Sequence, residues 1–121
     1  MSRRITILGA TGSIGQSTID LVRRDRSAYR VVALTGGNNI AQLAKDAIEL
    51  NAEIAVTANE GLLSDLKRAL QGTGIEASAG RSALLEAAER DADIIMSAIV
   101  GAAGLEPGLR AMRRGSTLAL A

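Results

Sequence analysis

The sequence predicts an α/β fold, in which a doubly wound, mostly parallel sheet carries helices on both faces. Two observations support this prediction. Short apolar runs rich in β-branched residues alternate, along all 121 residues, with segments whose apolar residues recur every three or four positions. The connections between these elements are short, and no internal repeat or linker interrupts them. We therefore expect one domain whose strands are joined by right-handed crossovers.

The first strand, the first helix and the second strand form the clearest unit. Residues 4–8 are a short β-branched run that stops at Gly9. Residues 14–22 have helical spacing, and residues 30–34 are apolar almost throughout, as expected for a parallel strand covered on both faces. The helix face that we expect to be buried carries Ile14, Thr18, Leu21 and Val22.

Two further helices and two further strands follow. Asn39 is a candidate N-cap for a helix, and residues 53–57 have strand character. Asn59 is expected to cap the next helix, which ends before Gly72, and a weak strand is expected at 75–78. The buried faces of these helices are expected to carry Ile40, Leu43, Ala44, Ala47 and Ile48 in the first and Leu62, Leu63, Leu66 and Leu70 in the second.

The last third of the sequence predicts two more helices and two more strands. Residues 82–90 have the spacing of a short helix. Residues 93–98 begin polar and become apolar, which suits a central strand, and a final strand is expected at 117–121. The helix between these two strands is expected from the spacing of Leu105, Leu109 and Met112.

The composition excludes several classes of protein. Lys and Arg number 14 and Asp and Glu 13, so the charge balance indicates neither a basic surface that binds nucleic acid nor one that binds an anionic membrane. The chain has no Cys and no His, which removes thiolate metal sites and the usual base of a serine triad, and we identify no catalytic or metal-ligating residue in it. Tyr29 is the only aromatic residue, so the core must be built from Ala, Leu, Ile and Val. No apolar run is long enough for a signal or membrane helix, and a cytoplasmic location is expected.

The most informative segment is residues 9–15, Gly-Ala-Thr-Gly-Ser-Ile-Gly, between the first strand and the first helix. Glycines at this place permit a tight turn, close approach of a pyrophosphate to backbone N–H groups, and close packing of helix on strand. The segment lacks the Gly-Lys-Ser/Thr ending of a P-loop, so a nucleotide triphosphatase is not expected. An ordinary tight turn is the alternative, but the flanking strands and helix favour a Rossmann-type dinucleotide site.

The residues after the second strand affect the choice between nicotinamide cofactors. An acidic residue there would bind the ribose hydroxyl of NAD and repel the 2′-phosphate of NADP, but residues 35–39 contain none. We therefore expect a phosphate to sit on Gly37, Asn38 and Asn39. Because no Arg or Lys is present among them, the expected preference for NADP is modest. For Asn39, a plain helix cap is an equally good and compatible interpretation.

A third run of small residues, 98–104, follows the strand expected at 93–98. Small residues at the carboxyl end of a central strand let a cofactor lie across the topological switch point, beside the first glycine turn. The alternative is a tight turn into the last helix.

Together these segments resemble the amino-terminal NADPH-binding domain of the 1-deoxy-D-xylulose 5-phosphate reductoisomerase family over essentially the whole chain. Three blocks carry the resemblance, and the last is specific to that family. Asn38 departs from the pattern, because the family frequently has a basic residue there. The blocks are residues 7–15 with Ser17 and Thr18, residues 31–34, and residues 98–105 with Pro107.

The resemblance implies a metal-dependent enzyme of the non-mevalonate route to isoprenoid precursors. Such an enzyme rearranges 1-deoxy-D-xylulose 5-phosphate and reduces the product with NADPH to 2-C-methyl-D-erythritol 4-phosphate. Residues 1–121 would be its NADPH-binding domain, with the catalytic and carboxy-terminal domains, the substrate residues and the ligands of Mg²⁺ or Mn²⁺ beyond Ala121. The 121-residue chain alone is then expected to be inactive. No nucleic-acid or membrane partner is expected, and a homodimer is compatible with the resemblance.

The cofactor-binding residues fall into three groups. The resemblance implies that the first holds the pyrophosphate, the second the adenosine 2′-phosphate region and the third the middle of the cofactor. The residues expected to bind the cofactor are Gly9, Thr11, Gly12, Ser13, Ile14; Gly37, Asn38, Asn39; and Ala98, Ile99, Val100, Ala103.

Two other functions stay open on the sequence alone. A semialdehyde dehydrogenase has a cofactor domain with a similar glycine turn, and it would need a catalytic Cys beyond residue 121. A non-catalytic NAD(P)-binding sensor module could use the same turn without chemistry. The downstream sequence separates the three, since only the reductoisomerase would continue with Asn-Lys-Glu and later acidic metal ligands.

Overall fold

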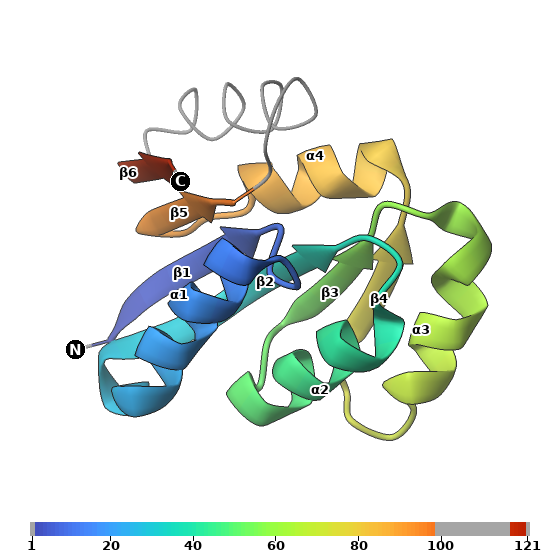
Figure 1. The fold of residues 1–121 in the computed structure, drawn as a ribbon, viewed down its shortest axis with the longest axis horizontal. Helices are drawn as coiled ribbons and strands as arrows, with labels where there is room; N and C mark the ends of the chain where they lie inside the picture. The colour runs from blue at the N-terminus through green and yellow to red at the C-terminus, as the bar shows by residue number, and fades with distance from the viewer. Residues whose placement is uncertain (1, 99–116, 121) are drawn as a thin grey trace.

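The computed structural model describes residues 2–98 and 117–120, which include a six-stranded sheet (Figure 1). The strand order is β4-β3-β2-β1-β5-β6, and every neighbouring pair is parallel. The doubly wound parallel sheet predicted from the sequence is therefore confirmed. The strands are β1 (Arg3–Leu8), β2 (Tyr29–Gly36), β3 (Ile54–Thr57), β4 (Glu76–Ala79), β5 (Ile94–Ser97) and β6 (Thr117–Leu120).

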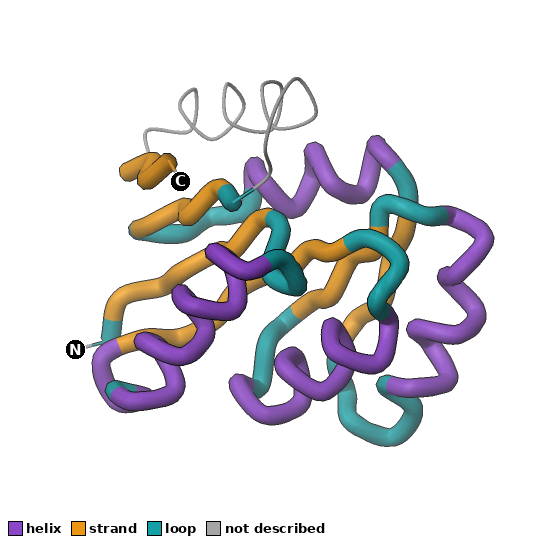
Figure 2. Tube along the Cα trace, in the orientation of Figure 1, coloured by secondary structure: helices purple, strands orange, loops and turns teal. Residues whose placement is uncertain are grey.

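Helices cover both faces of the sheet, as Figure 2 shows. Three of those in the described residues pack on one face in a shared cluster of buried side chains, and the fourth packs on the other face. Two short 3-10 turns, Arg26–Ala28 and Glu60–Leu62, precede β2 and α3. The α-helices are α1 (Ser13–Arg24), α2 (Ile40–Leu50) and α3 (Leu63–Ala69) on the first face and α4 (Arg81–Glu89) on the second.

The path of the chain reverses at β1. From β1 to β4 each strand is added on the same side of its predecessor, with α1, α2 and α3 as the connections. After β4 the chain crosses back and adds β5 on the free side of β1. Because crossovers between parallel strands are right-handed, this reversal places α4 on the opposite face. The topological switch point therefore lies between β1 and β5.

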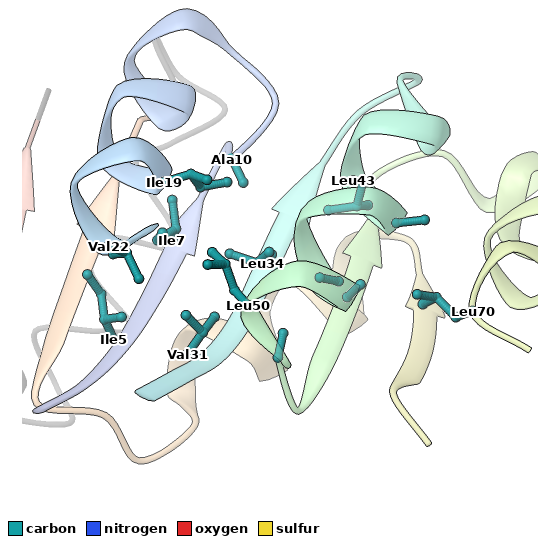
Figure 3. Close-up of a cluster of buried hydrophobic side chains, with 14 of the residues drawn as sticks. Ile5, Ile7, Ala10, Ile19, Val22, Val31, Leu34, Leu43, Leu50 and Leu70 are labelled. Carbon is teal, nitrogen blue, oxygen red and sulfur yellow. The ribbon is translucent and has the colours of Figure 1, made fainter. Parts of the chain in front are cut away.

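The core consists of two apolar layers, one on each face of the sheet. Neighbouring residues of β1 point to opposite faces, so Ile7 belongs to the layer under α1 and Leu8 to the layer under α4. Figure 3 shows the first layer, where Ile19 of α1 lies beside Ile7 and Leu50 of α2 lies beside Leu34. All the buried hydrophobic residues described are Ala, Ile, Leu or Val, as the composition predicts.

The buried faces of the helices differ in part from the sequence prediction. Ile14 and Leu21 were expected inside but are 45% and 63% exposed, and Ile48 of α2 is 47% exposed. The predicted face of α1 combined two adjacent stripes, and only the one containing Thr18 and Val22 packs on the sheet, together with Gly15 and Ile19. The reason is that Gly15 has no side chain, which lets this stripe approach the backbone at the end of β1.

Two further differences concern the second half of the chain. Leu62 and Leu63 are only half-buried: Leu62 lies in the 3-10 turn that precedes α3, and Leu63 is the first residue of the helix, one turn before the buried Leu66. The helix expected from the spacing of Leu105 to Met112 lies outside the described residues. Within the described residues, no helix combines the length and the apolar character needed to cross a membrane.

Candidate functional site

The carboxyl ends of β1, β2 and β5 bring the three sequence segments together at one edge of the sheet (Figure 1). We call this the carboxyl edge, and its described members are residues 9–15, residues 36–39 and Ala98. The N–H of Ala98 donates to the carbonyl oxygen of Leu8 at 2.8 Å, so the ends of β5 and β1 are hydrogen-bonded neighbours. Ligands of open α/β sheets bind outside the carboxyl ends at such a switch point.

Thr35 of β2 anchors the first part of the glycine turn. The N–H of Gly9 donates to Thr35 Oγ1 at 2.9 Å, and the N–H of Ala10 donates to the Thr35 carbonyl at 2.7 Å. Gly9 has a φ of +79°, a left-handed conformation that glycine adopts without strain. These contacts turn the chain sharply from β1 towards α1. They also occupy the first two N–H groups of the turn, which are therefore not available to a ligand.

Three of the next N–H groups of the turn are free within the described part of the chain, whereas that of Gly12 donates to the Gly9 carbonyl at 3.4 Å. Those of Thr11, Ser13 and Ile14 have no hydrogen-bond partner among the described residues, and no side chain caps α1 at Gly12. No acidic side chain lies in the first turn of α1 to compete for them. Gly12, Ser13 and Ile14 are exposed. Unpaired N–H groups and the positive end of the helix dipole together form an arrangement suited to an anion.

Gly15 and Gly12 have different roles in the turn. A Cβ on Gly15 would overlap the carbonyl oxygen of Gly9 and come within 2.7 Å of the Ala10 backbone, so helix and turn can touch only at a glycine. A Cβ on Gly12 would have no neighbour closer than Gly9 O at 3.8 Å. Among the described residues, nothing therefore fills the space beside Gly12, as close approach of a ligand to the backbone requires.

The second segment lies at the end of β2 and the start of α2. Asn39 caps α2, as predicted, because its side chain accepts the N–H of Gln42 at 3.3 Å. Asn38 Oδ1 accepts Nδ2 of Asn59 at 3.0 Å, and Thr57 Oγ1 donates to the Gly37 carbonyl at 2.7 Å. Gly37, Asn38 and Asn39 are all exposed, and nothing lies within 4 Å of a Cβ built on Gly37.

The third segment is described only at its first residue. Ala98 is half-buried at the end of β5. The other expected cofactor residues of this segment, Ile99, Val100 and Ala103, lie outside the described residues. The structure therefore brings nine of the twelve predicted site residues to one edge: Gly9, Thr11, Gly12, Ser13, Ile14, Gly37, Asn38, Asn39 and Ala98.

Sequence reasoning missed four residues that shape this edge. Thr35 anchors the turn and Asn59 holds Asn38, although Asn59 was expected only to cap a helix. Gln16 donates through Nε2 to the carbonyl of Ala10 at 2.9 Å and to the carboxylate of buried Asp46 at 2.7 Å. No local pattern marks any of these contacts, because each joins residues on different elements.

The charged groups with shifted pKa values lie away from the carboxyl edge. A hydrogen-bonded pair with Arg23 lowers the pKa of the Glu49 carboxyl and raises that of the Arg23 guanidinium, at the carboxyl ends of α1 and α2. Hydrogen bonding to Asp91 raises the pKa of Arg4 at the start of β1. The described carboxyl edge thus offers N–H donors and amides suited to binding, without a perturbed acid or base.

A hollow of about 550 Å³ lies at the opposite edge, between Tyr29, Asn51 and Gly74. Its cations already have partners: Arg26 donates to the Glu49 carbonyl at 2.8 Å, and Arg30 lies 3.7 Å from Glu53. This hollow faces the amino ends of the strands, away from the switch point.

Comparison with known proteins gives consistent matches. Residues 5–121 match the model of the 1-deoxy-D-xylulose 5-phosphate reductoisomerase family. The 1-deoxy-D-xylulose 5-phosphate reductoisomerase of Jannaschia sp. (strain CCS1) is 70% identical over 119 residues, which are 98% of this chain and 30% of that protein. The chain thus spans about a third of the length of the curated relatives that it matches.

Solved structures agree with the sequence matches. The 1-deoxy-D-xylulose 5-phosphate reductoisomerase from Zymomonas mobilis in complex with NADPH superposes with a TM-score of 0.98 at 51% identity, over 100% of this chain and 32% of that one. A DOX-P reductoisomerase in complex with magnesium superposes with a TM-score of 0.91 at 34% identity, over 100% of this chain and 31% of that one.

Proposed function

Because the chain belongs to the 1-deoxy-D-xylulose 5-phosphate reductoisomerase family, we propose that residues 1–121 form the NADPH-binding domain of such an enzyme. The full-length protein rearranges 1-deoxy-D-xylulose 5-phosphate and reduces the product with NADPH to 2-C-methyl-D-erythritol 4-phosphate. The observation that carries the proposal is the uncapped amino end of α1 at the topological switch point. Membership of this family leaves the semialdehyde dehydrogenase and the sensor module without support.

The pyrophosphate of NADPH lies against the amino end of α1. The free N–H groups of Thr11, Ser13 and Ile14 donate to its oxygens, and the empty space beside Gly12 admits it. This role agrees with the exposure of Ile14, which was expected to be buried as well as to bind the cofactor. Gly9 has its N–H bonded to Thr35, so in this proposal it shapes the turn instead of donating to phosphate.

The adenosine 2′-phosphate lies against Gly37, Asn38 and Asn39. No acidic residue follows β2 to repel a phosphate there, which favours NADPH over NADH. The Nδ2 group of Asn38 is free to donate, since its Oδ1 accepts from Asn59. The side-chain oxygen of Asn39 caps α2, so its Nδ2 group is the part of the side chain that can donate to the phosphate.

The middle of the cofactor crosses the switch point beside Ala98, with Ile99, Val100 and Ala103 as the further expected contacts. Reduced nicotinamide supplies a hydride for the reduction step. This chain contributes the orientation of the cofactor. The partners in this proposal are NADPH and a sugar phosphate, in a cytoplasmic enzyme without nucleic-acid or membrane partners, and a homodimer is compatible with it.

The described residues do not fit a metal site. No group of three or more His, Cys, Asp or Glu side chains gathers within the described part of the chain. A DOX-P reductoisomerase has been solved with magnesium, and in our proposal the Mg²⁺ or Mn²⁺ of the full-length enzyme is held by residues other than those described. We therefore assign no step of the reaction to a metal on this chain.

The proposal predicts binding by the chain and turnover only by the longer protein. The 121-residue chain should bind NADPH in a calorimetric titration. It should oxidise no NADPH when mixed with 1-deoxy-D-xylulose 5-phosphate and Mg²⁺, because it holds no substrate against the nicotinamide. The full-length protein should oxidise NADPH under the same conditions. Turnover by the purified 121-residue chain, or a full-length protein inactive on this substrate, would contradict the proposal.

Asn38→Arg should sharpen the selectivity for NADPH. A guanidinium at this exposed position adds a charge-assisted contact to the 2′-phosphate, so the Kd for NADPH should fall about five- to tenfold while that for NADH stays unchanged. Ser27→Arg adds the same charge at the opposite edge and serves as the control, with both affinities unaltered. Equal tightening of NADH and NADPH by Asn38→Arg would move the 2′-phosphate away from residues 37–39.

A further inference from the structure

The buried carboxylate of Asp46 is the one titratable side chain in the described residues that lies entirely inside the core, at 0% exposure. It sits on α2, and its two oxygens accept from different helices. Oδ2 accepts Nε2 of Gln16 from α1 at 2.7 Å, and Oδ1 accepts Nε2 of Gln42 from its own helix at 2.9 Å. The guanidinium of Arg23 lies 3.9 Å from Oδ1 and compensates part of the cost of burying this charge, and the two amide donors satisfy its oxygens.

Gln16 connects this carboxylate to the glycine turn. Its Nε2 group donates to the Ala10 carbonyl at 2.9 Å as well as to Asp46. Both partners are acceptors, so the amide nitrogen must face them, and both of its hydrogens are used. Without the carboxylate, the Nε2 group loses one of the two hydrogen bonds that hold it in place, and the amide is free to rotate away from the Ala10 carbonyl.

The Ala10 carbonyl and the Thr11 N–H belong to one planar trans peptide, in which the two groups point in opposite directions. Gln16 holds the carbonyl towards the space between α1 and α2. The Thr11 N–H therefore points away from that space, and it has no partner among the described residues. Fixing the carbonyl fixes the direction of this free N–H.

We propose that Asp46 is a positioning residue, which acts through Gln16 to hold the Thr11 N–H in the direction required for the cofactor pyrophosphate. The inference rests on the proposed function for the identity of the ligand. The orientation of the peptide itself does not depend on the ligand, and it can be tested in the free protein. Neither residue touches the cofactor in this proposal.

Asp46→Leu in the full-length protein is the main test. Leucine has a similar volume and removes both acceptors, so the Kd for NADPH should rise about tenfold. Adenosine 2′-monophosphate, which lacks the pyrophosphate, should bind with unchanged affinity. The melting temperature should fall, because the substitution leaves the amides of Gln16 and Gln42 without an acceptor and removes the carboxylate that lies 3.9 Å from Arg23. A merely structural role for Asp46 would weaken both ligands, whereas the positioning role weakens NADPH alone.

Three further variants separate the link to Gln16 from a general effect. Asp46→Asn should bind NADPH normally, because its single oxygen can face Gln16 while the amide of Gln42 rotates to accept the new Nδ2. Gln42→Leu should also bind normally, since it leaves the Gln16 contact in place. Gln16→Met should reproduce the loss seen in Asp46→Leu, and the double variant should lose no more than either alone. Additive losses would overturn the inference.

Backbone order at Thr11 gives a readout that needs no cofactor. The ¹⁵N order parameter of the Thr11 amide in the free protein should be near 0.85, roughly that of a rigid backbone, and should fall towards about 0.6 in Asp46→Leu. An order parameter of the Thr11 amide that is the same in Asp46→Leu as in the parent would overturn the inference, even if the parent protein binds NADPH. If the parent protein bound no NADPH while the order parameter fell as expected, the proposed function would fail and the positioning role would stand.

Discussion

Gly15→Ala should destabilise the protein by roughly 3 kcal/mol or more, the largest effect expected for a single methyl group anywhere in the described chain. The added Cβ would overlap the carbonyl oxygen of Gly9 and stand 2.7 Å from the Ala10 backbone. Neither neighbour is a flexible side chain, so the helix must move away from the turn. That movement separates Ile19 and Val22 from the sheet.

Thermal unfolding followed by circular dichroism measures this effect. A loss of this size lowers the melting temperature by about 10 °C or more in a domain of this length. Gly37→Ala is the matched control, because nothing lies within 4 Å of its Cβ and its φ is not left-handed. A Gly15→Ala protein as stable as Gly37→Ala would show that α1 does not rest on the turn at residue 15.

The features that the sequence predicted well are local ones. The glycine turn, the N-cap at Asn39 and the order of strands and helices over residues 2–98 depend on residues a few positions apart, and each agrees with the structure. The two-sided burial of β2 follows from its continuous apolar run, since both apolar layers draw side chains from it.

The choice of buried helix face could not be predicted from spacing alone. On α1, one stripe carries Ile14 and Leu21 and the next carries Ile19 and Val22, so both offer large apolar side chains, yet only the second is buried. Hydrophobicity predicts which residues gain from burial, but here the close approach of helix to turn decides which stripe faces the sheet. Only a glycine permits that approach, and the cost of leaving Leu21 in water is smaller than that of a backbone clash.

The residues that shape the carboxyl edge from neighbouring elements were also beyond prediction from sequence. Thr35 lies 26 positions from Gly9, and Asp46 lies 30 positions from Gln16. Thr, Gln and Asp are ordinary residues in a strand or on a helix, and their roles appear only when the fold brings the end of β2 and the middle of α2 close to the turn and the start of α1. Side-chain contacts of this kind depend on the completed fold.

Gly12→Val is expected to reduce the affinity for NADPH about a hundredfold or more while the protein stays folded. The backbone of Gly12, with φ −76° and ψ 171°, is accessible to valine, and the nearest atom to its Cβ is 3.8 Å away. In our proposal the pyrophosphate reaches the N–H groups of Thr11, Ser13 and Ile14 through the space that the valine side chain would occupy. Losing two hydrogen bonds to a charged group costs about 3 kcal/mol, and that energy corresponds to the hundredfold loss.

Calorimetric titration of NADPH and of adenosine 2′-monophosphate distinguishes this effect from a general disturbance. The fragment lacks the pyrophosphate and contacts residues 37–39 in our proposal, so its affinity should not change in Gly12→Val. Gly12→Ala adds a smaller side chain and should give an intermediate loss for NADPH. Because valine is a poor N-cap residue, the melting temperature of Gly12→Val should fall slightly, by far less than that of Gly15→Ala. NADPH binding equal to that of the parent would mean that the pyrophosphate lies elsewhere than at the amino end of α1.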